Sequence, residues 1–139
     1  MWRKLWSLKV PPKSRNLVWR ACNVVLPTAD LLKRKGVDLD VICRLCRQQD
    51  ESIFHVMVQC PFARQCWEVS RIGFILGSAS AFTKWLSLGF QRLAVEDCCY
   101  LIRVCWRLCF ANVVAHLLAW ETRPIADARS RVSLRLRSF

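Results

Sequence analysis

Four residues near the middle of the chain have the types and spacing of a structural zinc site. Cys43 and Cys46 form a Cys-x2-Cys pair, and His55 and Cys60 follow shortly after it. Three thiolates and one imidazole complete the tetrahedral shell that structural zinc sites use. The x2 spacing lets one tight turn direct both sulfurs at a single ion, while backbone N–H groups donate hydrogen bonds to the thiolates. The spacing therefore predicts a closed Cys3His zinc site.

The second pair of ligands needs helices to position it. Asp50 can cap a short helix over residues 51–59 that carries His55. Cys60 directly precedes Pro61, and proline is favoured in the first turn of a helix. Cys60 is then expected at a helix N-terminus, where the positive end of the helix dipole favours the metal-binding thiolate.

The alternative interpretation is that these cysteines are unrelated core residues, because free cysteine is among the most buried residue types. The chain has nine cysteines, so a chance Cys-x2-Cys pair is plausible, but a chance His-x4-Cys pair in the same polar segment is much less so. Cys66 stays open as a stray ligand. The cysteines predicted to be core residues have no histidine at ligand spacing and are Cys22, Cys66, Cys98, Cys99, Cys105 and Cys109.

A longer series of motifs surrounds the four ligands. In chain order it comprises Trp2-Arg-Lys-Leu-Trp6, Lys9-Val-Pro-Pro-Lys13, Leu17-Val-Trp19-Arg20, Leu26-Pro27-Thr28, Leu32-Lys-Arg34-Lys-Gly36, Cys43-Arg-Leu-Cys46, Glu51-Ser52, His55, Cys60-Pro-Phe-Ala-Arg64 and Trp67. This series resembles the reverse transcriptase zinc-binding domain, which follows the polymerase in plant LINE-type, non-LTR retrotransposon polyproteins. The resemblance covers about half of the chain. It implies that zinc is held by Cys43, Cys46, His55 and Cys60.

The limits of the chain are also informative within this resemblance. The family pattern usually begins some residues before the Trp-x3-Trp motif and is often followed by a ribonuclease H domain. This chain starts at Met1 and stops at Phe139, and no segment resembles a polymerase or the carboxylates of a ribonuclease H. The resemblance continues more weakly to Trp106 and Asn112, with Ala111 where the family commonly has arginine. We therefore expect a fragment of such a polyprotein.

Composition and periodicity predict a small, mainly α domain organised around the zinc site. The 139 residues are 54% hydrophobic, which is enough for a core. Helices are expected over residues 14–25 after a Ser14 cap, from a Thr28 cap to Gly36, and over 61–76, 85–93 and 95–120. The apolar faces of two of them are expected to contain Leu17, Val18, Ala21, Val24 and Val25, and Phe62, Cys66, Val69 and Phe74.

The chain is expected to divide into three parts. Residues 1–76 would be the zinc-binding core, residues 77–120 a helical continuation after the Gly77–Ser80 linker, and residues 121–139 a basic tail. Because no apolar signal segment follows Met1, secretion is not expected. An odd number of cysteines then indicates reduced thiols and zinc in the nucleus or cytoplasm rather than disulfides.

The apolar stretch 98–120 also has to be considered as a membrane span. Arg103 and Arg107 interrupt it, and one central arginine costs about 2.5 to 3.5 kcal/mol on insertion scales. Glu96 shares their helical face, so we predict a core helix with one solvated stripe, or an interface helix for a neighbouring domain, and no membrane span. His116 has no partner at ligand spacing and is assigned to packing or to the surface.

The net charge of +12 is concentrated at the N-terminus, where residues 1–36 contain nine Lys and Arg against one acid. Residues 37–70 contain three against five. The basic cluster in residues 1–36 predicts contact with phosphates of RNA or DNA, and the alternative is that it is a solvated face. The tryptophans among these residues, Trp2, Trp6 and Trp19, could stack on bases but are expected in the core. The predicted contact residues are Arg3, Lys4, Lys9, Lys13, Arg15, Arg20, Lys33, Arg34 and Lys35, and the tail adds Arg123, Arg129, Arg131, Arg135 and Arg137.

Together these features predict a non-catalytic, zinc-binding accessory module of a retrotransposon reverse transcriptase that contacts RNA or DNA. Four protein ligands leave no open position on zinc for a reacting water, so no enzymatic activity is expected. The alternative is a structural module in which zinc stabilises the fold and the long apolar helix docks on a polymerase or another protein.

Overall fold

The computed structural model describes residues 1–70, 72 and 79–121, with side chains as far as Leu117. The described helices are α1 (Trp2–Ser7), α2 (Pro12–Cys22), α3 (Ala29–Arg34), the π-helical turn η1 (His55–Gln59), α4 (Pro61–Glu68), α5 (Phe82–Arg92) and α6 (Val95–Glu121). These residues contain no strand, only one isolated antiparallel bridge between Ile42 and Asp50. The mainly α prediction is confirmed.

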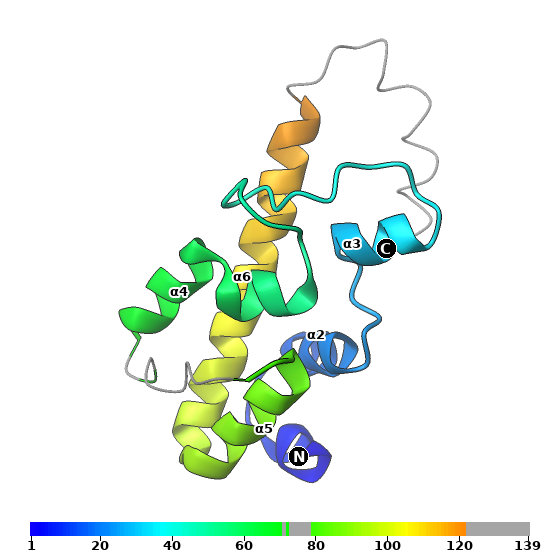
Figure 1. Ribbon diagram of the computed structural model, residues 1–139. Coiled ribbons are helices and arrows are strands. Elements are labelled where there is room, and N and C mark those ends of the chain that lie inside the picture. Colours follow the sequence, from blue (N-terminus) through cyan, green and yellow to red (C-terminus); the bar gives the residue numbers. More distant parts are fainter. Residues whose placement is uncertain (71, 73–78, 122–139) are drawn as a thin grey trace.

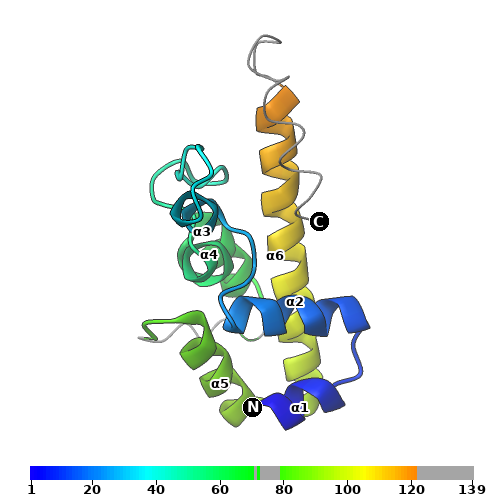
Figure 2. The same ribbon diagram turned by 90° about the vertical axis from the view of Figure 1, so that its right-hand side faces the viewer.

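The long helix α6 is the axis on which the other elements pack. Helix α2 crosses it, and α1 and α5 lie at its N-terminal end (Figure 1, Figure 2). The turn η1 packs against the side of α6 and against α4, so the segment that contains the predicted ligands lies between α3, α4 and α6 (Figure 2). The zinc segment is thus held by elements from both ends of the chain.

One continuous core connects the N-terminal half with the helices after the predicted linker. Trp67 of α4 packs against Trp85 of α5, with ring centroids 5.1 Å apart, and its indole N–H donates to the Met57 carbonyl at 2.8 Å. The same core contains Leu5 of α1 and Leu101 of α6. The predicted division at residues 76 and 77 falls outside the described residues, as does the predicted tail beyond residue 121.

Helix α2 differs from its prediction at both ends. It begins at Pro12, which occupies the first turn, so Ser14 is a buried residue inside the helix and not its cap. It ends at Cys22, because Val24 adopts a left-handed backbone with φ of 57°. Val24 and Val25 are therefore exposed rather than on the apolar face, whereas Leu17, Val18 and Ala21 are buried as predicted.

The end of α3 confirms the role predicted for Gly36. Thr28 precedes the helix as its N-cap residue, and Gly36 follows it with φ of 86°. The Val37 N–H donates to the Leu32 carbonyl at 3.1 Å and the Gly36 N–H to the Lys33 carbonyl at 2.9 Å. This is the Schellman arrangement, in which the left-handed residue is usually glycine because it lacks a Cβ.

Helix α4 is shorter than predicted, and its exposed and buried faces differ from the expectation. It ends at Glu68, Val69 is 88% exposed, and Phe62 is also exposed. Ala63 and Trp67 supply the buried contacts instead, because the large indole of Trp67 fills the space between η1 and α5. Phe74 and the first two residues of the predicted 77–80 linker lie outside the described residues.

Helices α5 and α6 lie where the sequence predicts them. The stretch Val95–Leu117 is long and apolar enough to cross a membrane by length and composition, criteria that the core helix of a soluble protein also meets. In this structure α6 packs on α2 and η1. Glu96, Arg103 and Arg107 are exposed along one side of it, which confirms the predicted solvated stripe.

Candidate metal centre

The first two ligands lie on a tight turn closed by backbone hydrogen bonds. The Cys43 N–H donates to the Gln49 carbonyl and the Arg47 N–H to the Cys43 carbonyl, both at 2.8 Å. Arg47 has a left-handed backbone with φ of 56°, which reverses the chain after Cys46. The turn therefore brings both sulfurs of the Cys-x2-Cys pair to the same side.

The third ligand is positioned by Ser52 and not by Asp50. The His55 N–H donates to the Ser52 hydroxyl at 3.1 Å, and the Val56 N–H donates to the Ser52 carbonyl at 2.9 Å. Asp50 instead pairs with Ile42 in the bridge that closes the zinc turn. The predicted cap is wrong because the helical residues begin only at Ile53, so Ser52 is placed to cap them and Asp50 lies two positions too early.

The π-helical turn explains how His55 and Cys60 reach the same ion. The Cys60 N–H donates to the His55 carbonyl at 2.7 Å, the five-residue spacing that defines a π-helix. In an α-helix two residues five apart would point about 140° away from each other. As predicted, Cys60 is the N-cap of α4 and Pro61 occupies its first turn.

The four ligand atoms of Cys43, Cys46, His55 and Cys60 all lie within 4.8 Å of one another. The Cys43 and Cys60 sulfurs are 4.0 Å apart, and the Cys46 sulfur is 3.3 Å from Nε2 of His55. Tetrahedral zinc with ligand distances of about 2.0 to 2.3 Å places its ligand atoms roughly 3.5 to 3.8 Å from each other. The donor set and its geometry therefore fit a zinc ion.

Burial controls the protonation of the ligands. It raises the pKa of the Cys43 thiol to about 12 and also raises that of Cys60. For Cys46, burial is outweighed by hydrogen bonds from the Gln48 and Gln49 backbone and from the other two thiols, so its pKa is lowered. Burial lowers the pKa of His55, which favours the neutral imidazole that binds metal. A divalent cation is the natural counter-charge for thiolates gathered in this way.

Residues 1–67 match the family model described as zinc-binding in reverse transcriptase. The match covers just under half of the chain and agrees with the resemblance that its motifs predict. A protein of Arabidopsis thaliana that carries the provisional name of a ribonuclease H protein is 27% identical over 63 residues, which are 45% of this chain. The chain spans only about a tenth of that relative's length. No solved structure matches the chain significantly.

A buried carboxylate, Glu51, fastens this zinc-binding domain to the rest of the molecule. Glu51 is 1% exposed, and its Oε1 accepts the Ala29 N–H at the start of α3 at 3.0 Å. Its other oxygen pairs with Nε2 of His116 on α6, and its backbone N–H donates to the Val41 carbonyl at 2.7 Å. The residue thus connects the zinc segment with α3 and α6.

His116 is therefore a specific partner of Glu51, which refines its assignment to packing or the surface. The two residues are separated by 65 positions, so no local spacing could have paired them. The sequence offered no signal for the pair, because a glutamate in a polar segment is ordinarily exposed and only the structure shows Glu51 to be buried.

Three of the nine cations predicted to contact nucleic acid make contacts within the molecule. Lys4 donates to the carbonyls of Phe90 and Leu93 at the end of α5. Arg15 donates to the Trp6 carbonyl at 2.9 Å, and the ammonium of Lys13 lies 5.0 Å from the centre of the Trp106 ring. These side chains contribute to the fold whatever else they bind.

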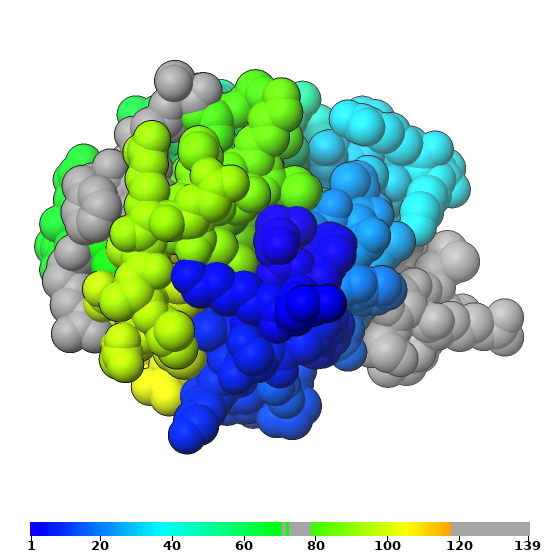
Figure 3. Space-filling model, turned by 90° about the horizontal axis from the view of Figure 1, so that it is seen from below, coloured from blue at the N-terminus to red at the C-terminus, as the bar shows by residue number. Residues whose placement is uncertain are grey.

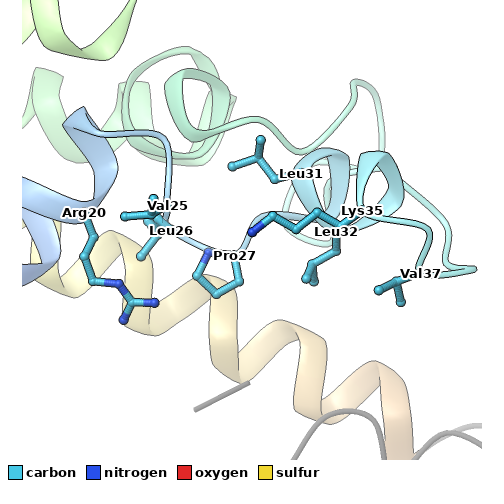
Figure 4. Close-up of a pocket in the computed structure, with 8 residues that line it drawn as sticks. All are labelled: Arg20, Val25, Leu26, Pro27, Leu31, Leu32, Lys35 and Val37. Atoms are coloured by element: carbon cyan, nitrogen blue, oxygen red, sulfur yellow. The ribbon is translucent and has the colours of Figure 1, made fainter. Parts of the chain in front are cut away.

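Two further predicted cations, Arg20 and Lys35, line a hollow of about 320 Å3 between α2 and α3 (Figure 4). Its other walls are aliphatic or proline side chains, namely Val25, Leu26, Pro27, Leu31, Leu32 and Val37. The remaining predicted cations are the exposed residues Arg3, Lys9, Lys33 and Arg34. Helices α1 and α3 lie on opposite sides of α2, so the nine cations are spread along the N-terminal segment and do not form one compact patch (Figure 2).

The expectation that the N-terminal tryptophans lie in the core is wrong. Trp2, Trp6 and Trp19 are 38%, 48% and 39% exposed. On α1 the buried residue is Leu5, and on α2 the residue next to Trp19 that is buried is Val18. The faces of α1 and α2 that point into the core carry smaller side chains, so these three rings lie on other faces and remain partly in solvent.

Proposed function

We propose that the chain is a non-catalytic accessory module of a retrotransposon reverse transcriptase, stabilised by one zinc ion and contacting RNA or DNA. The observation that carries the zinc part is the convergence of Cys43, Cys46, His55 and Cys60 on one point. All four positions of a tetrahedral shell are filled by protein atoms, which leaves no site for a reacting water. The ion's role is then structural.

Zinc bound here would join two segments of the chain. Cys43 and Cys46 lie on the turn that precedes Asp50, whereas His55 and Cys60 belong to η1 and the start of α4. Binding free energies for such sites reach about 10 to 16 kcal/mol in isolated zinc-finger peptides. The ion can therefore hold the turn beside η1 and α4, and the match to a zinc-binding family model supports zinc as that ion.

The nucleic-acid part rests on charge. Among the exposed cations, Arg3 lies on α1, Lys9 follows it, and Lys33, Arg34 and Lys35 lie at the end of α3. Among these five cations, only Arg34 has a described ion-pair partner, which is Asp30 at 3.5 Å. An exposed ion pair of this kind is weak. Cations of this kind attract phosphates with little dependence on base sequence and release counterions.

The decisive experiment measures metal content and salt-dependent binding on the same zinc-loaded protein. Replacing Lys33, Arg34 and Lys35 together with Gln should weaken binding to all sequences alike and flatten the dependence of affinity on salt, by about 0.7 to 0.9 for each phosphate that is no longer neutralised. The control replaces Arg92, Arg103 and Arg107 with Gln, an equal change in charge on exposed positions of α5 and α6. Equal effects in both variants would contradict a defined contact surface.

One observation favours the alternative, a protein-docking module. Phe110 of α6 is 61% exposed and Leu117 is exposed on the same side, so part of the long helix presents an apolar surface. A zinc-loaded chain that binds neither RNA nor DNA even at low salt would favour this function. A chain ending after residue 120 tests whether the arginine tail, rather than the folded part, carries binding.

A further inference from the structure

Three exposed indoles lie on two helices that touch each other. Trp2 and Trp6 are one turn apart and therefore share a face of α1, while Leu5 points into the core. The Arg15 guanidinium on α2 donates to the carbonyls of Trp6 at 2.9 Å and Leu8 at 3.4 Å. The end of α1 is thus fastened to the side of α2.

The third indole belongs to the same surface. Trp19 is one turn after Arg15, so it lies on the face of α2 that Arg15 uses to reach α1. A helical side chain covers the turn that precedes it, which places the Trp19 ring toward Arg15. The two helices lie next to each other on one face of the molecule (Figure 3). The three rings therefore lie on exposed faces of two neighbouring helices, α1 and α2.

The charge around this surface indicates what would cover it. Arg3 on α1 and Lys9 in the connection to α2 are exposed, and residues 1–22, which contain these two helices, have six cations and no acid. A partner of ordinary protein composition would leave these cations without counter-charges. A nucleic-acid strand supplies phosphates for the cations and flat bases for the indoles.

We infer that Trp2, Trp6 and Trp19, together with Arg3 and Lys9, form a stacking platform for single-stranded nucleic acid. The inference rests on the proposed function and specifies its ligand. In a duplex the base faces are covered by neighbouring bases, so only an unpaired strand can stack on these rings. The platform accepts any base sequence, because every base has an aromatic face.

The test uses the full zinc-loaded chain and fluorescently labelled oligonucleotides, a single strand of deoxythymidine and a blunt duplex of the same length. Trp6→Ala and Trp19→Ala should each weaken single-strand binding by about 5-fold to 150-fold, the range for loss of one stacked base. Duplex binding and the dependence on salt should change little, because no cation is removed. Trp6→Phe and Trp19→Phe, which keep an aromatic face, should restore most of the affinity.

Phe110→Ala is the control, since Phe110 is an aromatic residue on α6 that is more exposed than Trp6 or Trp19 and does not belong to the platform. It should leave single-strand binding unchanged, and zinc content and circular dichroism should show that each variant is folded. Equal loss of duplex and single-strand affinity in Trp6→Ala and Trp19→Ala, or no loss at all, would overturn the platform while leaving the salt-dependent proposal intact. Absence of any binding at low salt would overturn both.

Discussion

The interaction of Glu51 with its two partners predicts a large effect of one substitution at a residue outside the ligand set. Glu51→Ala removes the acceptor of the buried Ala29 N–H and the partner of His116. An unsatisfied buried donor costs about 1 to 3 kcal/mol, removal of the hydrogen bond to the histidine about 1 kcal/mol, and removal of the methylene about 0.8 kcal/mol. The variant no longer has to bury a carboxylate, and the desolvation free energy saved in this way offsets part of the sum. We expect the free energy of unfolding to fall by about 2 to 4 kcal/mol.

Glu51→Gln separates hydrogen bonding from charge. The amide carbonyl can still accept from Ala29 and the amide N–H2 can donate to His116, so a loss of about 1 kcal/mol or less is expected. His116→Ala should be costly in the natural protein, because it leaves a buried carboxylate oxygen without its partner, and much less costly in the Glu51→Gln background. This non-additivity, about 0.5 to 3 kcal/mol for residues that touch each other, is the signature of the pair.

The assay is urea unfolding of the zinc-saturated protein, followed by circular dichroism and tryptophan fluorescence. Glu68→Ala is the control, because Glu68 is an exposed glutamate on α4 and its replacement should change stability by no more than about 0.5 kcal/mol. Two outcomes would contradict a stabilising role for the contacts of Glu51 with α3 and α6. One is a Glu51→Ala variant that is no less stable than Glu68→Ala, and the other is additive effects of His116→Ala and Glu51→Gln on the free energy of unfolding.

Three further predictions concern single side chains. Cys43→Ser should lose zinc because Cys43 is one of the four clustered ligands, whereas Cys105→Ser should keep it because Cys105 is a core residue outside that cluster. Elemental analysis of protein purified under reducing conditions measures the zinc content. Lys4→Met should lower the free energy of unfolding by about 1.5 to 3 kcal/mol, because the Lys4 ammonium group donates to carbonyls at the end of α5. Urea unfolding measures this loss, and a variant of normal stability with weakened RNA binding would contradict the prediction. Burial raises the pKa of the Cys22 and Cys109 thiols to about 11, so between about pH 9 and pH 11 these thiols ionise in the unfolded chain but not in the folded one. The stability that they contribute is therefore complete below about pH 9 and is lost as the pH rises toward 11, and a urea midpoint that stays constant above about pH 9 would refute this prediction.

Several local features could be predicted because they depend on a few neighbouring residues. The Cys-x2-Cys turn brings two sulfurs together over a reach of four residues, and the structure brings the four ligand atoms within 4.8 Å. Gly36 ends α3 because a left-handed residue is needed there, and Pro61 starts α4 because proline has the required backbone angle. These outcomes follow from backbone sterics and hydrogen bonding within one or two turns.

Other local predictions failed where two local solutions competed. Asp50 and Ser52 can both cap a helix, and Ser52 does so because the helical residues begin only at Ile53. The expected apolar face of α4 was wrong because Phe62 and Trp67 compete for burial, and only the position of α5 decides that the indole faces inward. Hydrophobicity alone ranks such residues almost equally.

The sequence by itself determined the ligand set, the mainly helical class and the basic character of the N-terminal segment. Only the tertiary structure decided which cations remain exposed, which tryptophans are buried, and that Glu51 pairs with His116. In the sequence Lys4 and Lys9 look alike, yet Lys4 caps α5 and Lys9 lies in solvent. The physical reason is range: a turn or a cap is set by the sterics of adjacent residues, whereas burial and distant partners depend on the free energy of the whole packed arrangement.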